Sequence, residues 1–333
     1  MKTGKVSETV LKRSVFKQLK TSRKEVLVKA GVGEDCSAVQ LEPGEAVVMS
    51  VDPITGTVED IGELSVYITV NDLASSGAEP IGILMSILLP PESEEKELRE
   101  LMQKAEAVCS TLNIQILGGH TEVTTAVTRP VVTVTGVGKV KTEKFVKTSG
   151  AIPGQDIVVS KWIGIEGTSI IAKEKEAELL KRFPASFVEQ AKRFDEYILI
   201  LDEAATAMKS GVSAMHDVTE GGIFGALWEI AEASGVGLDI DMKKIPVRQE
   251  TIELCEVFDL NPYMLISSGC LIMVADNGLD LVTALEREGI KGTVIGKVTE
   301  GNDRLIRNGE DFRYLERPRT DELYKIYETQ AEE

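Results

Sequence analysis

The chain has 333 residues, of which 43% are hydrophobic and 27% charged, the composition of a soluble globular protein long enough for two domains. Its formal net charge of −17 argues against a nucleic-acid-binding surface, because phosphate backbones attract basic faces. No apolar run reaches the ~20 residues that span a bilayer, and the N-terminus lacks the unbroken apolar core of a secretory signal, so we expect a cytoplasmic protein without membrane contact.

The first half of the chain predicts a mixture of helices and strands. Apolar residues at helical spacing predict a helix over 7–19, and a second helix is expected from Ser93, its N-cap, to Asn113. Strands are predicted at 25–41 (interrupted by a glycine-rich turn), 45–53, 65–91, 114–117 and 129–140. Residues 118–122, "GGHTE", are expected as the loop after the strand 114–117.

Ser, Gly and Pro cluster at 147–156, and this composition favours a linker. We therefore divide the chain into domains 1–152 and 153–333. Later elements are predicted as a strand at 156–164, a helical region at 169–210, a helix that starts after Thr219 and ends at Gly235, a strand within 265–276, a helix at 281–290 and a strand at 292–298.

The four cysteines are dispersed along the chain. Cys36, Cys109, Cys255 and Cys270 form no C-x-x-C pair, and no histidine lies at zinc-finger spacing from them. We expect neither disulfide bonds nor structural zinc, and interpret the cysteines as small buried side chains.

Acidic residues follow several predicted strands, close to glycines. They are Glu34 and Asp35, Asp52, Asp72, Glu122, and Asp217 with Glu220. Each acid alone is typical of an Asx turn or a helix cap. Together, converging carboxylates would repel one another unless cations lay between them, and Mg²⁺ prefers such oxygen ligands and shares its shell with phosphates.

The stretch "TEGG", residues 219–222, precedes a predicted amphipathic helix. The start of a helix presents free backbone N–H groups and a positive dipole end, which suit a phosphate. The alternative is a helix capped by Thr219 whose glycines Gly221 and Gly222 allow close packing against a strand.

The ordered series "GVGEDCSAV", "VDPITGT", "VNDLASSGAEP", "GGHTE" and "DVTEGG" resembles the aminoimidazole-ribonucleotide (AIR) synthetase superfamily, with the closest likeness to its HypE-like, synthetase-related members. The resemblance implies an α/β (α+β) PurM-like fold of two domains. The N-terminal domain would form a dimeric β-barrel with a second subunit, and the C-terminal domain would be α/β. The implied cofactors are ATP and Mg²⁺.

The resemblance also implies roles for individual residues. Mg²⁺ ligands would be Asp35, Asp52, Asp72 and Asp217, with Thr219 and Glu220 near nucleotide and metal. The glycine pairs Gly118-Gly119 and Gly221-Gly222 would line the phosphates. Lys147 stands near a position where some relatives have a nucleotide-binding arginine.

This chain departs from the superfamily pattern at His120, because the motif is usually Gly-Gly-Asp-Thr or Gly-Gly-Glu-Thr. His120 is a candidate acid, base or ligand, with Glu122 taking over acidic work, or it is a solvated turn residue. For His216 the same alternatives as for His120 stay open, and a further one is that it only orients the carboxylate of Asp217. The superfamily's dehydratase carries its substrate group on a C-terminal cysteine, whereas the last cysteine here is Cys270.

Two functions from different classes follow. The first is an ATP- and Mg²⁺-dependent phosphoryl-transfer or dehydratase-type enzyme that acts on a small metabolite as a homodimer. The second is a non-catalytic nucleotide-binding maturation or regulatory protein that acts through a partner protein.

Overall fold

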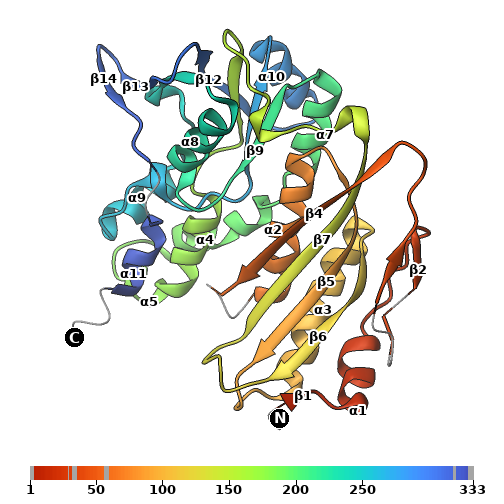
Figure 1. The fold of residues 1–333 in the computed structure, drawn as a ribbon. Coiled ribbons are helices and arrows are strands. Elements are labelled where there is room, and N and C mark those ends of the chain that lie inside the picture. Colours follow the sequence, from red (N-terminus) through yellow and green to blue (C-terminus); the bar gives the residue numbers. More distant parts are fainter. Residues whose placement is uncertain (1–3, 29, 32–35, 56–59, 318–319, 329–333) are drawn as a thin grey trace. The chain divides into compact units, whose positions relative to one another are not determined.

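The computed structural model divides into two compact units (Figure 1). The first unit contains residues 1–74 and 78–145, and the second contains residues 75–77 and 146–333. The structure describes all residues except 1–3, 29, 32–35, 56–59, 318–319 and 329–333. The sequence-based division at residue 152 stays a prediction. Within the described ranges, no helix combines the length and hydrophobicity needed to cross a membrane.

The first unit is built on a five-stranded sheet with the order β1-β6-β5-β7-β4. Its strands are antiparallel except for the parallel pair β5 and β6. The strands are β1 (Gly4–Lys5), β4 (Glu45–Ile54), β5 (Glu79–Leu89), β6 (Gln115–Val123) and β7 (Val131–Lys141), and β2 (Val26–Val28) pairs separately with β3 (Ala38–Val39). The helices are α1 (Glu8–Val10), the π-helical η1 (Leu11–Phe16), α2 (Ile61–Ser75), α3 (Glu95–Leu112) and the short 3₁₀ turn η2 (Thr142–Lys144).

Helix α2 corrects the strand prediction for the start of 65–91. The segment is apolar on all sides, and it is buried on nearly all sides in the structure. A fully buried helix and a fully buried strand have the same apolar pattern, so periodicity could not separate them. Only residues 79–89 form the expected strand, β5.

Helix α3 confirms the helix predicted after Pro90 and Pro91, with one correction at its start. The N-cap is Glu94, one residue after the predicted Ser93, and the Glu94 N–H donates to Glu97 Oε2 (3.0 Å). At the other end, Asn113 adopts a left-handed conformation with φ 54°, as a C-terminal stop requires.

Helices cover one face of the first sheet, and no described helix of this unit covers the other face (Figure 1). A Cβ on Gly136 of β7 would come within 2.5 Å of Thr69 Cγ2 in α2, so this glycine allows α2 to lie directly on the sheet. On the opposite face of β4, Val47, Met49 and Val51 are 42%, 66% and 60% exposed. Because β4 is also an edge strand, this apolar row borders unpaired backbone.

The second unit contains a seven-stranded sheet with the order β14-β13-β10-β12-β8-β11-β9. The strands are β8 (Asp156–Ser160), β9 (Ala214–Val218), β10 (Gly237–Asp241), β11 (Cys270–Ala275), β12 (Gly292–Thr299), β13 (Arg304–Asn308) and β14 (Asp311–Tyr314). The α-helices are α4 (Ile165–Glu174), α5 (Glu176–Leu179), α6 (Ala185–Lys192), α7 (Leu201–Ser210), α8 (Gly222–Ser234), α9 (Gln249–Val257), α10 (Gly278–Arg287) and α11 (Lys325–Glu328). Short 3₁₀ turns are η3 (Thr148–Gly150), η4 (Arg193–Tyr197), η5 (Met242–Lys244), η6 (Pro262–Met264) and η7 (Glu322–Tyr324).

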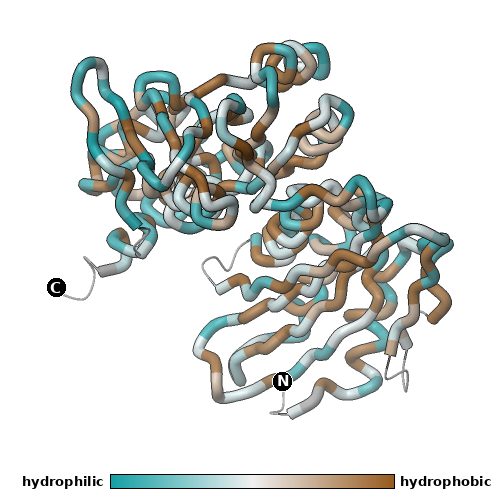
Figure 2. Tube along the Cα trace, turned by 45° about the horizontal axis from the view of Figure 1, so that its top comes forward, coloured by the Kyte–Doolittle hydropathy of each residue, from teal (hydrophilic) through white to brown (hydrophobic). Residues whose placement is uncertain are grey.

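Helices cover both faces of the second sheet. Ile157 and Val159 of β8 belong to the core that includes α8, whereas Val158 lies 3.1 Å from where a Cβ would stand on Gly278 of α10. All six residues of β11 are therefore buried, which accounts for its unbroken apolar run. Figure 2 shows hydrophobic residues concentrated where helices and strands meet inside each unit, with hydrophilic residues at the outer turns.

Candidate functional site

The glycine pair Gly118-Gly119 lies inside strand β6, so the loop predicted for 118–122 is wrong. Strand β6 continues to Val123 because it pairs with β5 along this whole stretch. Gly119 has φ 145°, and a Cβ there would lie 1.9 Å from Met85 O, so only glycine fits beside β5. At Gly118 a Cβ would meet its nearest neighbours at 3.5 Å, which is ordinary contact.

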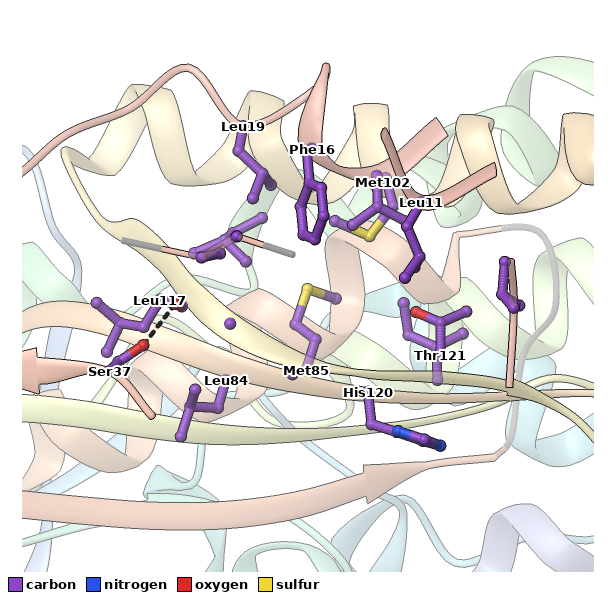
Figure 3. A pocket seen from close by; sticks show the side chains of 18 of the residues that line it. Leu11, Phe16, Leu19, Ser37, Leu84, Met85, Met102, Leu117, His120 and Thr121 are labelled. Atoms are coloured by element: carbon purple, nitrogen blue, oxygen red, sulfur yellow. Dashed lines mark hydrogen bonds between the residues drawn. The ribbon is translucent and has the colours of Figure 1, made fainter. Parts of the chain in front are cut away.

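A pocket of about 400 Å³ lies in the first unit between η1, α3 and the strands β5 and β6 (Figure 3). The backbone of Gly118 and Gly119 forms part of its wall. Its side-chain lining is mainly apolar and includes Leu11, Phe16, Leu19, Met85, Met102 and Leu117. Ser37 borders the pocket and donates from Oγ to Leu117 O (2.5 Å). The pocket thus combines mainly apolar side chains with polar backbone, including glycine backbone along one wall.

The N-terminal segment is held over this pocket by two glutamates of α3. Arg13 and Ser14 hydrogen-bond Glu95, Ser14 at 2.6 Å, and these bonds lower the pKa of Glu95 to about 2. Further along, Thr21 donates to Glu106 Oε1 from its N–H (2.7 Å) and its hydroxyl (2.6 Å). The N-terminal segment that covers the pocket is therefore hydrogen-bonded to α3 at two places along its length.

His120 and Glu122 lie on the open face of the sheet. Figure 3 shows the His120 ring on the opposite side of the strands from Met85 and Thr121, which point into the pocket. His120 Nε2 lies 3.2 Å from Glu122 Oε2, and both side chains are more than one-third exposed. The two predicted catalytic residues therefore do form a pair at the border of the pocket, whose lining includes His120 but not Glu122.

Asp52 is the predicted metal ligand of the first unit with a free acceptor atom. It lies inside β4, which continues to Ile54, and not in a loop after the strand. Its Oδ2 is buried without a hydrogen-bond partner. Asp52 pairs with Val134, which pairs with Met85, so Asp52 lies on the pocket side of the sheet, about 10 Å from Met85 across two strand spacings.

The other predicted ligands of the first unit are placed differently. Asp72 lies in α2, half-buried and with an interaction partner, because the segment is a helix and not a strand with a loop. Asp35 and Glu34 lie outside the described residues. No group of three or more His, Cys, Asp or Glu side chains in the described ranges is arranged to hold a metal ion.

In the second unit the turn before α8 does not leave its first N–H free. The N-cap is Gly221, with φ 80°, and not Thr219. The Gly221 N–H donates to Asp321 Oδ2 (2.7 Å), and the Gly222 N–H donates to Thr219 O (3.1 Å). A carboxylate of the same chain therefore occupies the anion position that the sequence predicted for a phosphate.

Asp321 was missed by the sequence reasoning. It also accepts N–H groups of Leu323 (2.8 Å) and Ile266 (3.2 Å), and burial raises its pKa to about 6. Asp321 precedes the helical segment Glu322–Glu328, so its type and position are those of an N-cap. That signal could have identified the cap, but not its distant partner Gly221.

Glu220 and Asp217 differ in their surroundings. Glu220 Oε1 accepts the hydroxyl of Tyr324 (2.6 Å), and this bond raises the pKa of Tyr324 to about 12. Asp217 lies inside β9, buried and with an interaction partner, because β9 extends to Val218.

The remaining predicted positions contribute little to this turn. His216 Nε2 lies 2.8 Å from Glu229 Oε2 of α8. Because adjacent residues of a strand face opposite sides of the sheet, His216 does not orient Asp217. Lys147 is exposed immediately before η3. The cysteines are unpaired; Cys109, Cys255 and Cys270 are buried as expected, but Cys36 is exposed beside the pocket.

Comparison with known proteins identifies the family of both halves. The model of the AIR synthase related protein N-terminal domain matches residues 33–140, and that of the C-terminal domain matches residues 153–307. The chain belongs to the AIR synthase related protein family. The mixed α/β fold of its two units is therefore the PurM-like fold that the motif series implied.

Several relatives of this chain are named as hydrogenase expression/formation proteins or as carbamoyl dehydratase HypE. A putative hydrogenase expression/formation protein of Methanocaldococcus jannaschii is 28% identical over 316 residues, covering 91% of this chain and 90% of that protein. Carbamoyl dehydratase HypE of Cupriavidus necator is 27% identical over 288 residues, covering 84% and 79%. The chain is thus HypE-like over nearly its whole length.

Solved structures of HypE share this fold. HypE in complex with ATP superimposes with a TM-score of 0.79 at 19% identity, covering 95% of each chain. HypE from a HypE–HypF complex superimposes with a TM-score of 0.70 at 21% identity, covering 84% of this chain and 92% of that chain.

Proposed function

We propose that this protein is an ATP- and Mg²⁺-dependent enzyme of the dehydratase type that acts on a small metabolite or a carried carbamoyl group. The observation that carries the proposal is the alignment with carbamoyl dehydratase HypE over 84% of the chain, which includes both family domains. Dehydration of a carbamoyl group needs its oxygen converted into a leaving group, and phosphoryl transfer from ATP does this.

The nucleotide would bind in the pocket of the first unit. A volume of about 400 Å³ is within the range of small-molecule sites, and apolar walls suit a purine base. The Gly118 backbone would lie along the phosphates, because a Cβ at this position would stand 3.5 Å from Leu84 and Ser37, which line the cavity. Gly119 would serve the strand pairing instead.

Mg²⁺ would be held by few protein ligands together with the phosphates. This ion commonly takes one or two carboxylates and completes its octahedral shell with phosphate oxygens and water. Asp52 fits that role because its buried Oδ2 has no partner and lies on the pocket side of the sheet. Mg²⁺ binding by Asp35 and Asp72 of the first unit, and by Asp217 and Glu220 of the second unit, stays a prediction.

His120 and Glu122 would act as an acid–base pair on the open face. A carboxylate 3.2 Å from an imidazole fixes the ring's orientation. Such a pair can accept a proton and release it again, and both groups are partly exposed in the single chain.

The chain would act as a homodimer through the open face of the first sheet. Val47, Met49 and Val51 form an exposed apolar row on edge strand β4, which is the kind of surface that a second copy covers in a shared barrel. His120 and Glu122 are on the same face, so the partner would also close over them.

The alternative is a non-catalytic nucleotide-binding protein that works through a maturation partner. One observation favours it: Asp321 occupies the Gly221 N–H that a phosphate would use. A HypE structure in complex with HypF matches this fold, and a partner of that kind is the one we would expect.

Turnover separates the two proposals. Phosphate release from ATP and Mg²⁺ would be measured for the wild type, for Asp52→Asn and for Asp311→Asn, an exposed matched control in β14. We expect release by the wild type and the control, and a loss of at least about tenfold in Asp52→Asn, since one metal ligand is removed. ATP binding without release in the presence of carbamoyl substrates would favour the non-catalytic alternative.

A further inference from the structure

A second cavity lies in the second unit, between the first turns of α8 and the chain that follows β13. Its volume is about 100 Å³, and its lining includes Gly221, the N-cap of α8, and Gly225 of α8. A water molecule occupies about 30 Å³ of liquid, so this space suits a group of few atoms and not a whole nucleotide.

Two arginines, Arg313 and Arg317, line the cavity. Neither forms an ion pair with a carboxylate of the described residues, whereas the neighbouring Arg307 is paired with Asp239 at 2.6 Å. Arg304 hydrogen-bonds Glu232 and lowers the pKa of that carboxyl, and Arg317 lowers it further, so the charge of Arg317 is offset in part. The two arginines of the cavity create a local positive field that attracts an anion.

One of these arginines lies within cation–π distance of an aromatic pair. The Arg313 guanidinium lies 5.3 Å from the ring centroid of Phe224, and Phe224 stacks on Tyr263 with 5.2 Å between centroids and an 11° interplanar angle. A cation–π contact of this kind attracts the guanidinium toward the ring without a carboxylate.

Asn261 adds an amide to the same cavity. Its Oδ1 accepts the Tyr263 N–H (3.1 Å), so the Nδ2 group remains as a donor. Glu316 also lines the cavity and opposes an anion, but it has an interaction partner of its own. The donors in this cavity are thus side chains, since the Gly221 N–H is already bound by Asp321.

We propose that this cavity is an oxyanion site that binds one phosphate-sized group through Arg313, Arg317 and Asn261. Arginine pairs match phosphate because each guanidinium can donate two parallel hydrogen bonds to it. The ligand is either inorganic phosphate or the phosphate group of a small monoester. This cavity lies in the second unit, whereas the proposed ATP pocket lies in the first unit.

Titration calorimetry of the full chain with inorganic phosphate, and separately with glycerol phosphate, tests this proposal at constant ionic strength. We expect saturable binding, weakened about tenfold by Arg313→Gln and by Arg317→Gln, because each loses a charge-assisted hydrogen bond. Arg307→Gln removes the same charge from strand β13 of the hairpin, outside the cavity, and is expected to bind as the wild type does. Whichever ligand binds more tightly identifies the source of the phosphate.

Absence of saturable binding of either ligand overturns the proposal, and so does equal weakening by all three substitutions, which would indicate general charge attraction. The titrations are repeated with a saturating non-hydrolysable ATP analogue. We expect unchanged phosphate affinity, and mutual exclusion would assign the cavity to the nucleotide instead. If the ATP analogue does not bind in the absence of phosphate, that result contradicts the proposed function but leaves the proposed phosphate site standing.

Discussion

Glu166 is a carboxyl group whose surroundings do not support its negative charge. It lies in α4, is 5% exposed, and has a buried Oε2 without a hydrogen-bond partner. Burial raises its pKa to about 7, against a hydrogen bond from Ser268 and with further repulsion from Asp321 and Glu220. The neutral acid is therefore the form that the fold favours.

This raised pKa predicts that the protein loses stability as pH rises. Between the unfolded value of 4.5 and about 7, the folded chain keeps a proton at Glu166 that the unfolded chain has released. The free energy of unfolding then falls through this window by on the order of 3 kcal/mol. Glu166→Gln is expected to flatten this slope in denaturation curves from pH 4.5 to 8, whereas Glu174→Gln, an exposed control in α4, should keep it. An unchanged slope in Glu166→Gln would contradict the assignment.

At the scale of residues, the sequence predicted contacts between nearby residues better than contacts between residues far apart in the chain. His120 and Glu122, two positions apart in a strand, do form a pair, because such residues share a face. Asp321 was missed since its partner Gly221 lies 100 residues earlier in the chain. The convergence of the predicted acids stays a prediction, and Asp35 lies outside the described residues.

At the scale of elements, β6 explains the glycine pair better than a loop does. The strand continues through Gly118 and Gly119 because β5 offers it backbone partners up to Leu89. Gly and His are typical of turns, so their pattern concealed the strand. The same limit applied to α2, whose uniform burial removed the periodicity that identifies a helix.

The two glycines are expected to respond differently to substitution. Gly119→Ala places a Cβ against Met85 O, and we expect it to lower the free energy of unfolding by at least about 2 kcal/mol. Gly118→Ala meets only ordinary contacts and should change stability by less than about 1 kcal/mol. Urea denaturation of both variants measures this difference. Equal losses would mean that β6 does not approach β5 as described.

At the scale of the whole molecule, the motif series predicted the family and its two-domain fold correctly. Buried strands such as β11 were recognisable from their apolar runs, because both faces of that sheet are covered. Subunit assembly is harder to predict from the sequence. The exposed apolar row of Val47, Met49 and Val51 on β4 gives the same alternating pattern as a strand with one face in the core. The dimer therefore stays a proposal.

A charge in this row should separate the proposed dimer. Val51→Lys is expected to raise the dimer dissociation constant by at least about tenfold, since burying an unpaired ammonium group is costly. Leu279→Lys, at a similarly exposed position of α10, is the matched control. Light scattering coupled to size-exclusion chromatography gives the mass of each. A wild-type monomer at all concentrations would contradict the proposed assembly.

The most direct test of the account is calorimetric binding of a non-hydrolysable ATP analogue with Mg²⁺ to the first-unit pocket. We expect the wild type to bind, and Gly118→Val to bind at least about tenfold more weakly because its added methyl groups fill the cavity. Ala126→Val, which enlarges an exposed side chain of the same unit, is expected to bind normally, with circular dichroism confirming that all three proteins are folded. No binding by the wild type, or equal binding by a folded Gly118→Val variant, would contradict the claim that this pocket holds the nucleotide.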